Sequence, residues 1–310
     1  MRILILGAGG IGGYFGARLQ QAGADITFLV RPARAEHLRE HRLRVWSPFG
    51  DLQLTPALLT AVDTHFDLVL LSCKAYDLAS ALDAITPAVG PQTVVLPLLN
   101  GIAHLDLLDA RFGRERVAGG VAHLALTLDE SGGIRHLNAS QRLIIGARHR
   151  SQSAGIDALG GLLTGISTDY TVSADIEQDM WDKLVFIATL AGATCLMRAS
   201  IGDILDTRAG RALIEGLLEE GAAVATACDR APAAQRMAGY RAQLTEAGST
   251  LTASMLRDVL RGARTEADHI LGDLCRRADA QSVSLPRLDL ACSHLQAYEA
   301  ARARLSESSG

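Results

Sequence analysis

Lysine is nearly absent from this chain. Of its 30 basic residues only two are lysines, Lys74 and Lys183, and the other 28 are arginines. Such a bias places arginine wherever any cation suffices, so a retained lysine is a candidate for chemistry that arginine cannot perform. Arginine stays protonated in proteins, whereas a lysine amine can lower its pKa and give up a proton. Both lysines are therefore candidate functional residues.

Other features are also scarce. The 310 residues are 48% hydrophobic and carry a net charge of −4, so the chain offers no basic field for nucleic acid or an anionic membrane. Its five cysteines are odd in number and form no C-x-x-C pair, which predicts reduced thiols in a cytoplasmic protein. The apolar run at residues 3–6 is too short for a signal peptide. The uncharged apolar stretch at residues 184–197 is shorter than the ~20 residues of a membrane-spanning helix.

Apolar runs and helical patterns alternate in the first half of the chain. Short apolar runs bounded by glycine or turn residues indicate buried strands, and the alternation predicts a doubly wound α/β sheet of parallel strands with a more antiparallel end. Gly132-Gly133 is typical of a hairpin turn. The expected strands are residues 2–6, 25–30, 67–72, 93–96, 117–128 and 167–172, and the expected helices are residues 11–22, 34–41, 77–85 and 105–112.

From about Glu177 the composition changes to alanine, leucine, arginine and glutamate with few β-branched runs. We expect an all-α second domain, with residues 1–174 forming a dinucleotide-binding domain and residues 175–310 a helical substrate and catalytic domain. Pro232 and Pro286 lie at plausible helix starts. The expected helices are residues 177–197, 208–229, 233–246, 249–261, 264–280 and 287–305.

A glycine-rich turn follows the first expected strand. The segment Gly7-Ala8-Gly9-Gly10-Ile11-Gly12 fits G-x-G-x-x-G and opens a helix, which is the context that gives this short pattern its meaning. Gly7 permits the tight turn, Gly9 lets the backbone approach a pyrophosphate, and Gly12 allows helix and strand to pack closely. The helix N-terminus then faces the anion. We expect these six residues to bind a dinucleotide.

The end of the second expected strand predicts which dinucleotide binds. An NAD site places a carboxylate about 20 residues past the glycine turn to hold the ribose 2′-hydroxyl. Here that position holds Arg31, with Arg34 close by, and the first carboxylate is Glu36. An arginine pair favours the 2′-phosphate of NADP(H).

Two further polar residues follow expected parallel strands. Lys74 comes just after residues 67–72, and Asn100 comes just after residues 93–96. Ligands of open α/β sheets bind at the carboxyl ends of the strands, so both are expected at the edge that carries the glycine turn. Lys183 instead lies near the start of the first helix of the second domain. The sequence leaves open whether its side chain lies at the surface or in a cleft.

Several of these segments together resemble one family. The glycine turn, the LLSCKA segment around Lys74, the LPLLNG segment around Asn100 and the Trp181-x-Lys183-Leu184 segment are similar to those of ketopantoate reductases. Ser254-Met255, followed by Thr265-Glu266, fits the same order and spacing. The resemblance covers essentially the whole chain. It implies a Rossmann domain, a helical domain and NADPH-dependent reduction of a 2-keto acid, in the family's namesake case ketopantoate to pantoate in pantothenate biosynthesis.

Carried over by position, the resemblance assigns a role to each residue. Lys183 is the implied general acid that protonates the carbonyl oxygen, and Glu266 binds and orients the substrate. Lys74 and Asn100 line the cofactor and substrate cleft, and Arg31 holds the 2′-phosphate. Ser254 contacts the substrate near its carboxylate. A cation that can also donate a proton suits a ketone oxygen that gains charge during hydride transfer.

The chain departs from the family on the helix of Lys183. The family usually has asparagine four and eight residues after the lysine, on the same helix face, where this chain has Ile187 and Ala191. Losing those polar groups weakens recognition of a hydroxylated substrate. We therefore expect a divergent member whose substrate is another, more apolar 2-keto acid or ketone.

Two other functions stay open, namely a 3-hydroxy acid or opine-type dehydrogenase and a non-catalytic NADP-binding sensor. The W-x-K-L and S-M…T-E spacings argue against the first, and the retained Lys183 argues against the second. The segment His37-Leu38-Arg39-Glu40-His41 matches a metalloprotease pattern, but no third ligand is evident, so no metal site is expected. The helical half offers a surface on which a homodimer could form.

Overall fold

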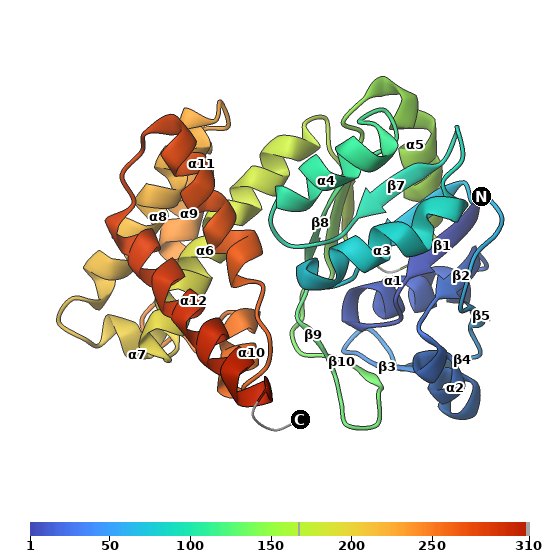
Figure 1. Ribbon diagram of the computed structural model, residues 1–310, viewed down its shortest axis with the longest axis horizontal. Helices are drawn as coiled ribbons and strands as arrows, with labels where there is room; N and C mark the ends of the chain where they lie inside the picture. The colour runs from blue at the N-terminus through green and yellow to red at the C-terminus, as the bar shows by residue number, and fades with distance from the viewer. Residues whose placement is uncertain (167, 308–310) are drawn as a thin grey trace. The chain divides into compact units, whose positions relative to one another are not determined.

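The computed structural model describes residues 1–166 and 168–307, and the chain divides into two compact units (Figure 1). The first unit comprises residues 1–100 and 104–179. The second comprises residues 101–103 and the chain from residue 180 onward. An α/β unit is thus followed by a helical one.

A five-stranded parallel sheet forms the centre of the first unit, in the strand order β5-β2-β1-β6-β7. Its central strands are continuous apolar runs because both faces of the sheet are covered. Leu6 pairs with Leu29 on one side and Leu71 on the other, so neighbouring strands end level. The strands are β1 (Arg2–Leu6), β2 (Asp25–Leu29), β5 (Ala57–Leu59), β6 (Leu68–Leu71) and β7 (Val94–Pro97). The predicted doubly wound parallel sheet is confirmed.

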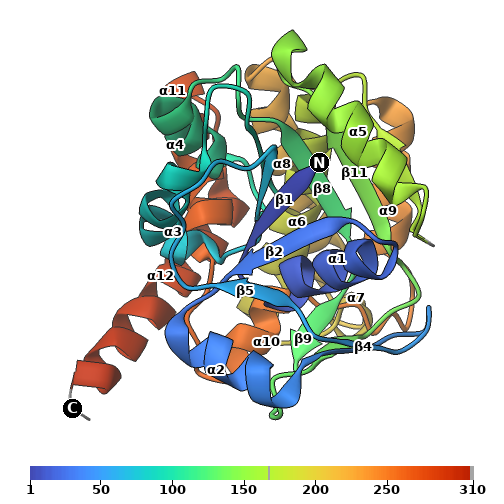
Figure 2. The same cartoon turned by 90° about the vertical axis from the view of Figure 1, so that its right-hand side faces the viewer.

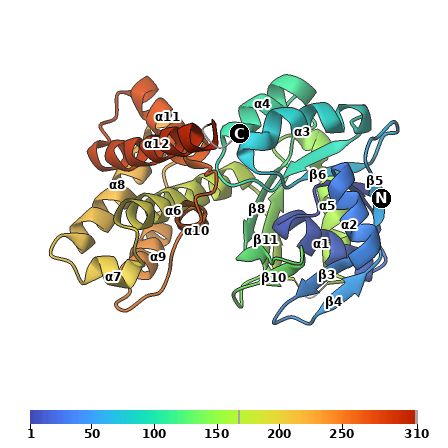
Figure 3. The same cartoon turned by 60° about the horizontal axis from the view of Figure 1, so that its bottom comes forward.

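Helices cover both faces of this sheet. The strand order reverses direction at β1, so right-handed connections place α1 on one face and α3 on the other, as Figure 3 shows. The helices after the parallel strands are α1 (Gly10–Gln21), α2 (Pro32–His41), α3 (Leu78–Ile85) and α4 (Ala103–Phe112), with the 3₁₀ turns η1 (Ala75–Asp77) and η2 (Thr86–Ala88) beside α3.

Two smaller sheets complete the first unit. One has the order β4-β3-β10-β9 and packs on α1, and the other has the order β12-β11-β8 and packs on α5 (Figure 2). Their strands are β3 (Leu43–Trp46), β4 (Leu52–Leu54), β8 (Gly119–His123), β9 (Leu126–Leu128), β10 (Ile134–His136), β11 (Arg142–Gly146) and β12 (Tyr170–Val172). The turn η3 (Arg150–Gln152) precedes α5 (Ser153–Leu163).

The smaller sheets correct two expectations and confirm one. The single strand expected at residues 117–128 is two strands, β8 and β9, which pair in different sheets. Strands β3, β4, β10 and β11, strand β5 of the parallel sheet and helix α5 were not expected. Strands β4, β5 and β10 have three residues each, which is too few for a clear pattern. The hairpin at Gly132-Gly133 is confirmed, because β9 and β10 are antiparallel and Gly132 has φ +70°. Residue 167 of the expected run 167–172 lies outside the described residues.

The second unit is built from helices, as predicted, and α8 packs against α6, α7, α9, α11 and α12 (Figure 1). Gly192 of α6 faces Leu217 of α8 and Ala291 of α12, and a Cβ at this position would be in van der Waals contact with both. The helices are α6 (Ile176–Met197), α7 (Ile201–Leu205), α8 (Gly210–Ala227), α9 (Ala234–Leu244), α10 (Ser254–Leu260), α11 (Asp273–Gln281) and α12 (Pro286–Glu307). A π-helical turn, η4 (Asp268–Gly272), runs into α11.

Two expected helices are shorter than their sequence patterns, and one was missed. Within residues 249–261 only Ser254–Leu260 is α-helical, and residues 264–280 begin with an irregular segment and η4 before α11. The short α7 was not expected. Pro286 is the first residue of α12, as predicted, and the buried Glu220 carboxylate accepts a hydrogen bond from Leu288 N at 2.8 Å in the first turn of that helix.

Helix α6 is long and apolar enough to cross a membrane by length and composition alone. However, 72% of its apolar window is buried inside the protein. It is a continuous helix whose first turn belongs to the first unit and whose remainder belongs to the second. Its apolar character is therefore that of a core helix.

A methyl group at Gly16 should destabilise the first unit. A Cβ there would lie 2.5 Å from both Ile5 Cδ1 and Phe28 Cζ, so Gly16→Ala overpacks the contact between α1 and the sheet. Overpacking costs about 1–3 kcal/mol, which outweighs the helix propensity that alanine gains. We expect calorimetry to show a melting temperature lower by a few degrees.

The matched control is Gly161→Ala, which also changes a helical glycine but has nothing within 4 Å of the new Cβ. That variant should melt at the wild-type temperature or above. Equal melting temperatures for Gly16→Ala and the wild type would contradict the packing described for α1.

Candidate active site

Three neighbouring strands of the parallel sheet end at one edge, and each is followed by a segment singled out in the sequence. The glycine turn follows β1, Lys74 follows β6 and Asn100 follows β7. The register keeps them together, since Leu98 N donates to Leu71 O at 2.8 Å and Ser72 Oγ donates to Leu6 O at 3.2 Å. This carboxyl edge is where open α/β sheets bind ligands.

The glycine turn has the shape that a pyrophosphate requires. Gly7 has φ +88°, and a Cβ on Gly12 would lie 2.6 Å from Gly7 O, so both positions exclude larger residues. A Cβ on Gly9 would instead project into open space within which a ligand can approach the backbone. Helix α1 begins with Gly9 as its N-cap and has no carboxylate in its first turn. Its first amide groups therefore favour an anion, and the residues present fit a dinucleotide.

The two arginines after β2 differ in their surroundings. Arg31 is the N-cap residue of α2, its side chain is 76% exposed, and its Nη2 lies 3.1 Å from Asp77 Oδ2. Arg34 is half-buried and donates through Nη2 to Ala8 O and Gly132 O, both at 2.9 Å. Burial lowers the pKa of Arg34 from its ordinary value. Arg34 therefore braces the glycine turn against the β9–β10 hairpin, and Arg31 is the more exposed arginine of the two.

Lys74 and Asn100 are both partly exposed. Lys74 is the residue before η1, and its carbonyl oxygen accepts from Asp77 N at 2.9 Å. Asn100 precedes Gly101, whose φ of +80° turns the chain sharply at the end of this segment. The backbone thus presents both side chains just beyond the strand ends, as the sequence predicted for this edge.

The second unit holds the other lysine. Lys183 lies on α6 and is partly exposed, and burial lowers its pKa from the ordinary 10.5 to about 8. The Glu266 carboxylate is near enough for its charge to act in the opposite direction. The adjacent Asp182 is buried and pairs with Arg236 Nε at 3.0 Å. A lysine and a carboxylate that are distant in sequence therefore lie near one another in the helical unit.

The remaining predicted substrate residues differ in exposure. Ile187, one turn after Lys183, is partly exposed, whereas Ala191 is 3% exposed. Ser254 is exposed and is the first residue of α10. Glu266 is partly exposed and lies just before η4. Such π-helical turns are often found at functional sites, and nothing in the pattern of residues 264–280 indicated this one.

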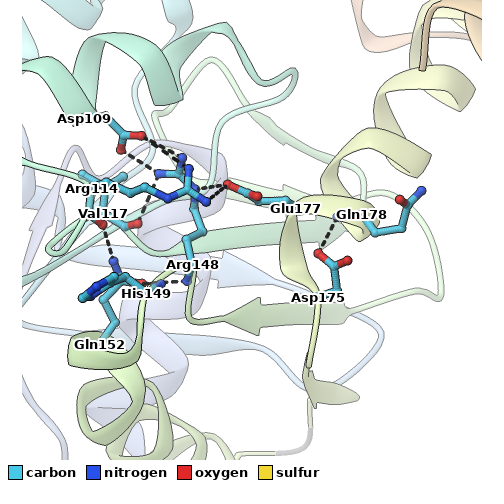
Figure 4. Close-up of polar contacts among 9 residues, drawn as sticks. All are labelled: Asp109, Arg114, Val117, Arg148, His149, Gln152, Asp175, Glu177 and Gln178. Atoms are coloured by element: carbon cyan, nitrogen blue, oxygen red, sulfur yellow. Dashed lines mark hydrogen bonds and ion pairs between the residues drawn. The ribbon is translucent and has the colours of Figure 1, made fainter. Parts of the chain in front are cut away.

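A buried ion-pair network holds the start of α6 within the first unit (Figure 4). Arg148, whose side chain is 3% exposed, donates to both carboxylate oxygens of Asp109 at 2.7 and 2.8 Å and to Glu177 Oε1 at 2.9 Å. Arg114 pairs with the same Glu177 oxygen at 2.8 Å. Burial alone would raise the pKa of Glu177, but the Arg148 hydrogen bond and the Arg114 charge lower it. The first turn of the helix that carries Lys183 is therefore firmly anchored.

Among the described residues, no group of three or more histidine, cysteine, aspartate or glutamate side chains is arranged to hold a metal ion. His37 and His41 lie on the same face of α2, with ring centroids 4.7 Å apart. Sequence reasoning missed the bracing role of Arg34 and the partnership of Asp77 with Arg31, because neither contact has a sequence motif.

Comparison with known proteins agrees with this architecture. The family described as ketopantoate reductase PanE/ApbA matches residues 3–150, and its C-terminal domain matches residues 175–299. Two proteins of Bacillus subtilis are similar over nearly their whole length. One, named uncharacterized oxidoreductase YkpB, is 37% identical and covers 97% of this chain and 99% of its own. The other, a 2-dehydropantoate 2-reductase, is 26% identical and covers 96% and 98%.

Among solved structures, the 2-dehydropantoate 2-reductase of Geobacter metallireducens has a TM-score of 0.87. It is 28% identical, and the match covers 96% of this chain and 99% of that one. Family, relatives and fold agree over both units, and the chain belongs to the ketopantoate reductase family of oxidoreductases.

Proposed function

We propose that this oxidoreductase reduces a 2-keto acid to the 2-hydroxy acid with NADPH, and that Lys183 donates the proton. The observation that carries the proposal is the lowered pKa of Lys183, beside Glu266, in a chain that otherwise uses arginine for almost every cation. A general acid is most effective when its pKa lies near the working pH, and an ordinary lysine is too weak an acid for this.

The dinucleotide would lie on the glycine turn, where the α1 amides favour its pyrophosphate and Arg31 is exposed to its 2′-phosphate. When bound, the reduced nicotinamide supplies the hydride. Lys74 and Asn100, which follow the neighbouring strands, are the residues of this unit that we assign to the cleft for cofactor and substrate.

Lys183 has two tasks in this reaction. Its ammonium stabilises the negative charge that develops on the carbonyl oxygen while the carbon accepts hydride. It then transfers a proton from Nζ to that oxygen, which completes the alcohol and leaves a neutral amine that solvent reprotonates. Glu266 keeps the amine more basic than burial alone would allow, so a useful fraction stays protonated near neutral pH. We assign to Glu266 and Ser254 the positioning of the substrate.

We propose further that the preferred substrate is more apolar than ketopantoate. Ile187 lies one helical turn from Lys183 and is partly exposed, so an alkyl group faces a substrate near the proton donor. The buried Ala191 adds no polar group on the next turn. The Bacillus comparison supports a substrate other than ketopantoate, since the chain is 37% identical to the differently named oxidoreductase and 26% identical to the 2-dehydropantoate 2-reductase.

Arginine at position 183 should retain the charge but lose the proton transfer. We expect Lys183→Arg to lower kcat for 2-keto acid reduction by about 100-fold, and Lys183→Met by about 1,000-fold or more. NADPH affinity, measured by fluorescence titration, should stay within about threefold of wild type, because the dinucleotide residues lie in the other unit. Full activity in Lys183→Arg would exclude Lys183 as the proton donor.

The pH dependence of reduction should follow the Lys183 amine. The ammonium is the donor, so kcat/KM for reduction should be level below about pH 8 and fall about tenfold per pH unit above it. Oxidation of the hydroxy acid needs the neutral amine and should show the opposite trend. Glu266→Gln removes the charge that raises this pKa, so the activity of this variant should begin to fall at a lower pH than that of the wild type. A level profile up to pH 10 would contradict the assignment.

Restoring a polar group at Ile187 should alter the choice of substrate. Ile187→Asn adds an amide one turn from Lys183, and we expect it to raise kcat/KM for ketopantoate relative to 2-ketoisovalerate by about tenfold. Ile187→Val is the control, because it keeps an apolar side chain and should keep the wild-type ratio. A wild-type enzyme that prefers ketopantoate over every apolar 2-keto acid tested would contradict the proposed substrate class.

A further inference from the structure

The contact between Arg31 and Asp77 lies where the adenosine ribose is expected. Arg31 follows β2 and Asp77 ends the turn η1 that follows β6, and these strands flank β1 on either side. The ion pair, with Nη2 and Oδ2 3.1 Å apart, therefore bridges the two segments on either side of the glycine turn. The pair is open to solvent, with 76% of the Arg31 side chain and 38% of the Asp77 side chain exposed.

The two side chains have opposite preferences for the ribose. An arginine near the end of the second strand accommodates a 2′-phosphate, whereas a carboxylate at this edge accepts a hydrogen bond from a 2′-hydroxyl. This chain places both groups within contact distance of each other. A 2′-phosphate that binds Arg31 has to displace Asp77 from the ion pair. The phosphate then lies near a carboxylate that repels it. A 2′-hydroxyl can donate to Asp77 while Arg31 stays paired.

From this we infer that Asp77 is a specificity-determining residue that weakens the preference for NADPH and lets the enzyme bind NADH as well. The inference rests on the proposed function, because it assumes a nicotinamide dinucleotide on the glycine turn. The inference also goes beyond the proposed function, since Arg31 alone would predict a strong preference for the phosphorylated dinucleotide. No sequence motif singled out Asp77, because it follows the strand of residues 68–71 and not the second strand, where a ribose-binding carboxylate is expected.

The effect of Asp77 on dinucleotide binding can be measured separately from that of the cations near it. Lys74 lies three residues earlier, just before η1, and is a second cation on this segment. Replacing Asp77 by asparagine removes the carboxylate but leaves Arg31 and Lys74, two cations suited to a phosphate. The ion pair is exposed, and such pairs add little to stability, so Asp77→Asn should fold as the wild type does.

The test is the ratio of the dissociation constants for NADH and NADPH, measured by fluorescence titration of the full-length protein without substrate. We expect wild type to prefer NADPH by no more than about tenfold, Asp77→Asn to raise that preference at least tenfold further, and Arg31→Gln to reverse it. Asp83→Asn is the matched control, because Asp83 forms an exposed ion pair with Arg111 at the same 3.1 Å on the neighbouring helix.

An unchanged ratio in Asp77→Asn, or the same change in Asp83→Asn, would overturn the inference. The test measures binding and needs no substrate. A failure to reduce any 2-keto acid would refute the proposed function, but the dissociation constants of the Asp77→Asn variant would still test the inference. If neither NADPH nor NADH binds at millimolar concentration, both are overturned together.

Discussion

The proposed chemistry depends on one lysine amine that has lost much of its hydration. Burial moves the pKa of Lys183 from 10.5 to about 8, and the charge of Glu266 limits how far it moves. Desolvation disfavours the charged ammonium relative to the neutral amine. The ammonium therefore gives up its proton more readily and can act as an acid near neutral pH. The balance between burial and one carboxylate therefore sets the protonation state on which the proposed reduction depends.

Each unit also has features that support the proposed chemistry. Helix α6 is long and apolar, as a helix that buries an amine must be, and its first turn is anchored through Glu177 to the buried Arg148. In the first unit the glycine turn exposes backbone amides to an anion, and Arg34 fixes the turn through the Ala8 carbonyl. The buried Arg148 thus holds the start of α6, and the half-buried Arg34 holds the glycine turn. Arg31 is exposed and pairs with Asp77, and Lys74 is partly exposed just beyond β6.

Sequence reasoning predicted the parts of the fold that have long, repeated patterns. The parallel sheet, the glycine turn and the helical second half all follow from apolar runs, periodicity and glycine spacing, and the edge positions of Lys74 and Asn100 follow from the strands before them. The three-residue strands β4, β5 and β9 were missed or merged, because a strand this short shows at most one alternation. Residues 249–261 look helical throughout, yet the helix begins only at Ser254.

The site was predicted less completely than the fold, for a physical reason. The proximity of Glu266 to Lys183, the Arg34 brace and the Arg31–Asp77 pair are all contacts between segments far apart in sequence, and such contacts leave no local pattern. Only the resemblance to a family singled out Glu266. Arg34 was grouped with Arg31 by its spacing, but its half-buried position gives it a structural role. Lysine scarcity was the one compositional signal that pointed at chemistry directly.

That scarcity also permits the most direct test of the account. Protein labelled with ¹³C at the lysine ε-carbons gives only two signals, from Lys74 and Lys183, and the Lys183→Arg variant identifies which is which. We predict that the Lys183 signal titrates with a midpoint of about 8. A midpoint above 10 would contradict the central claim, because an amine of ordinary basicity would not be the tuned proton donor proposed here.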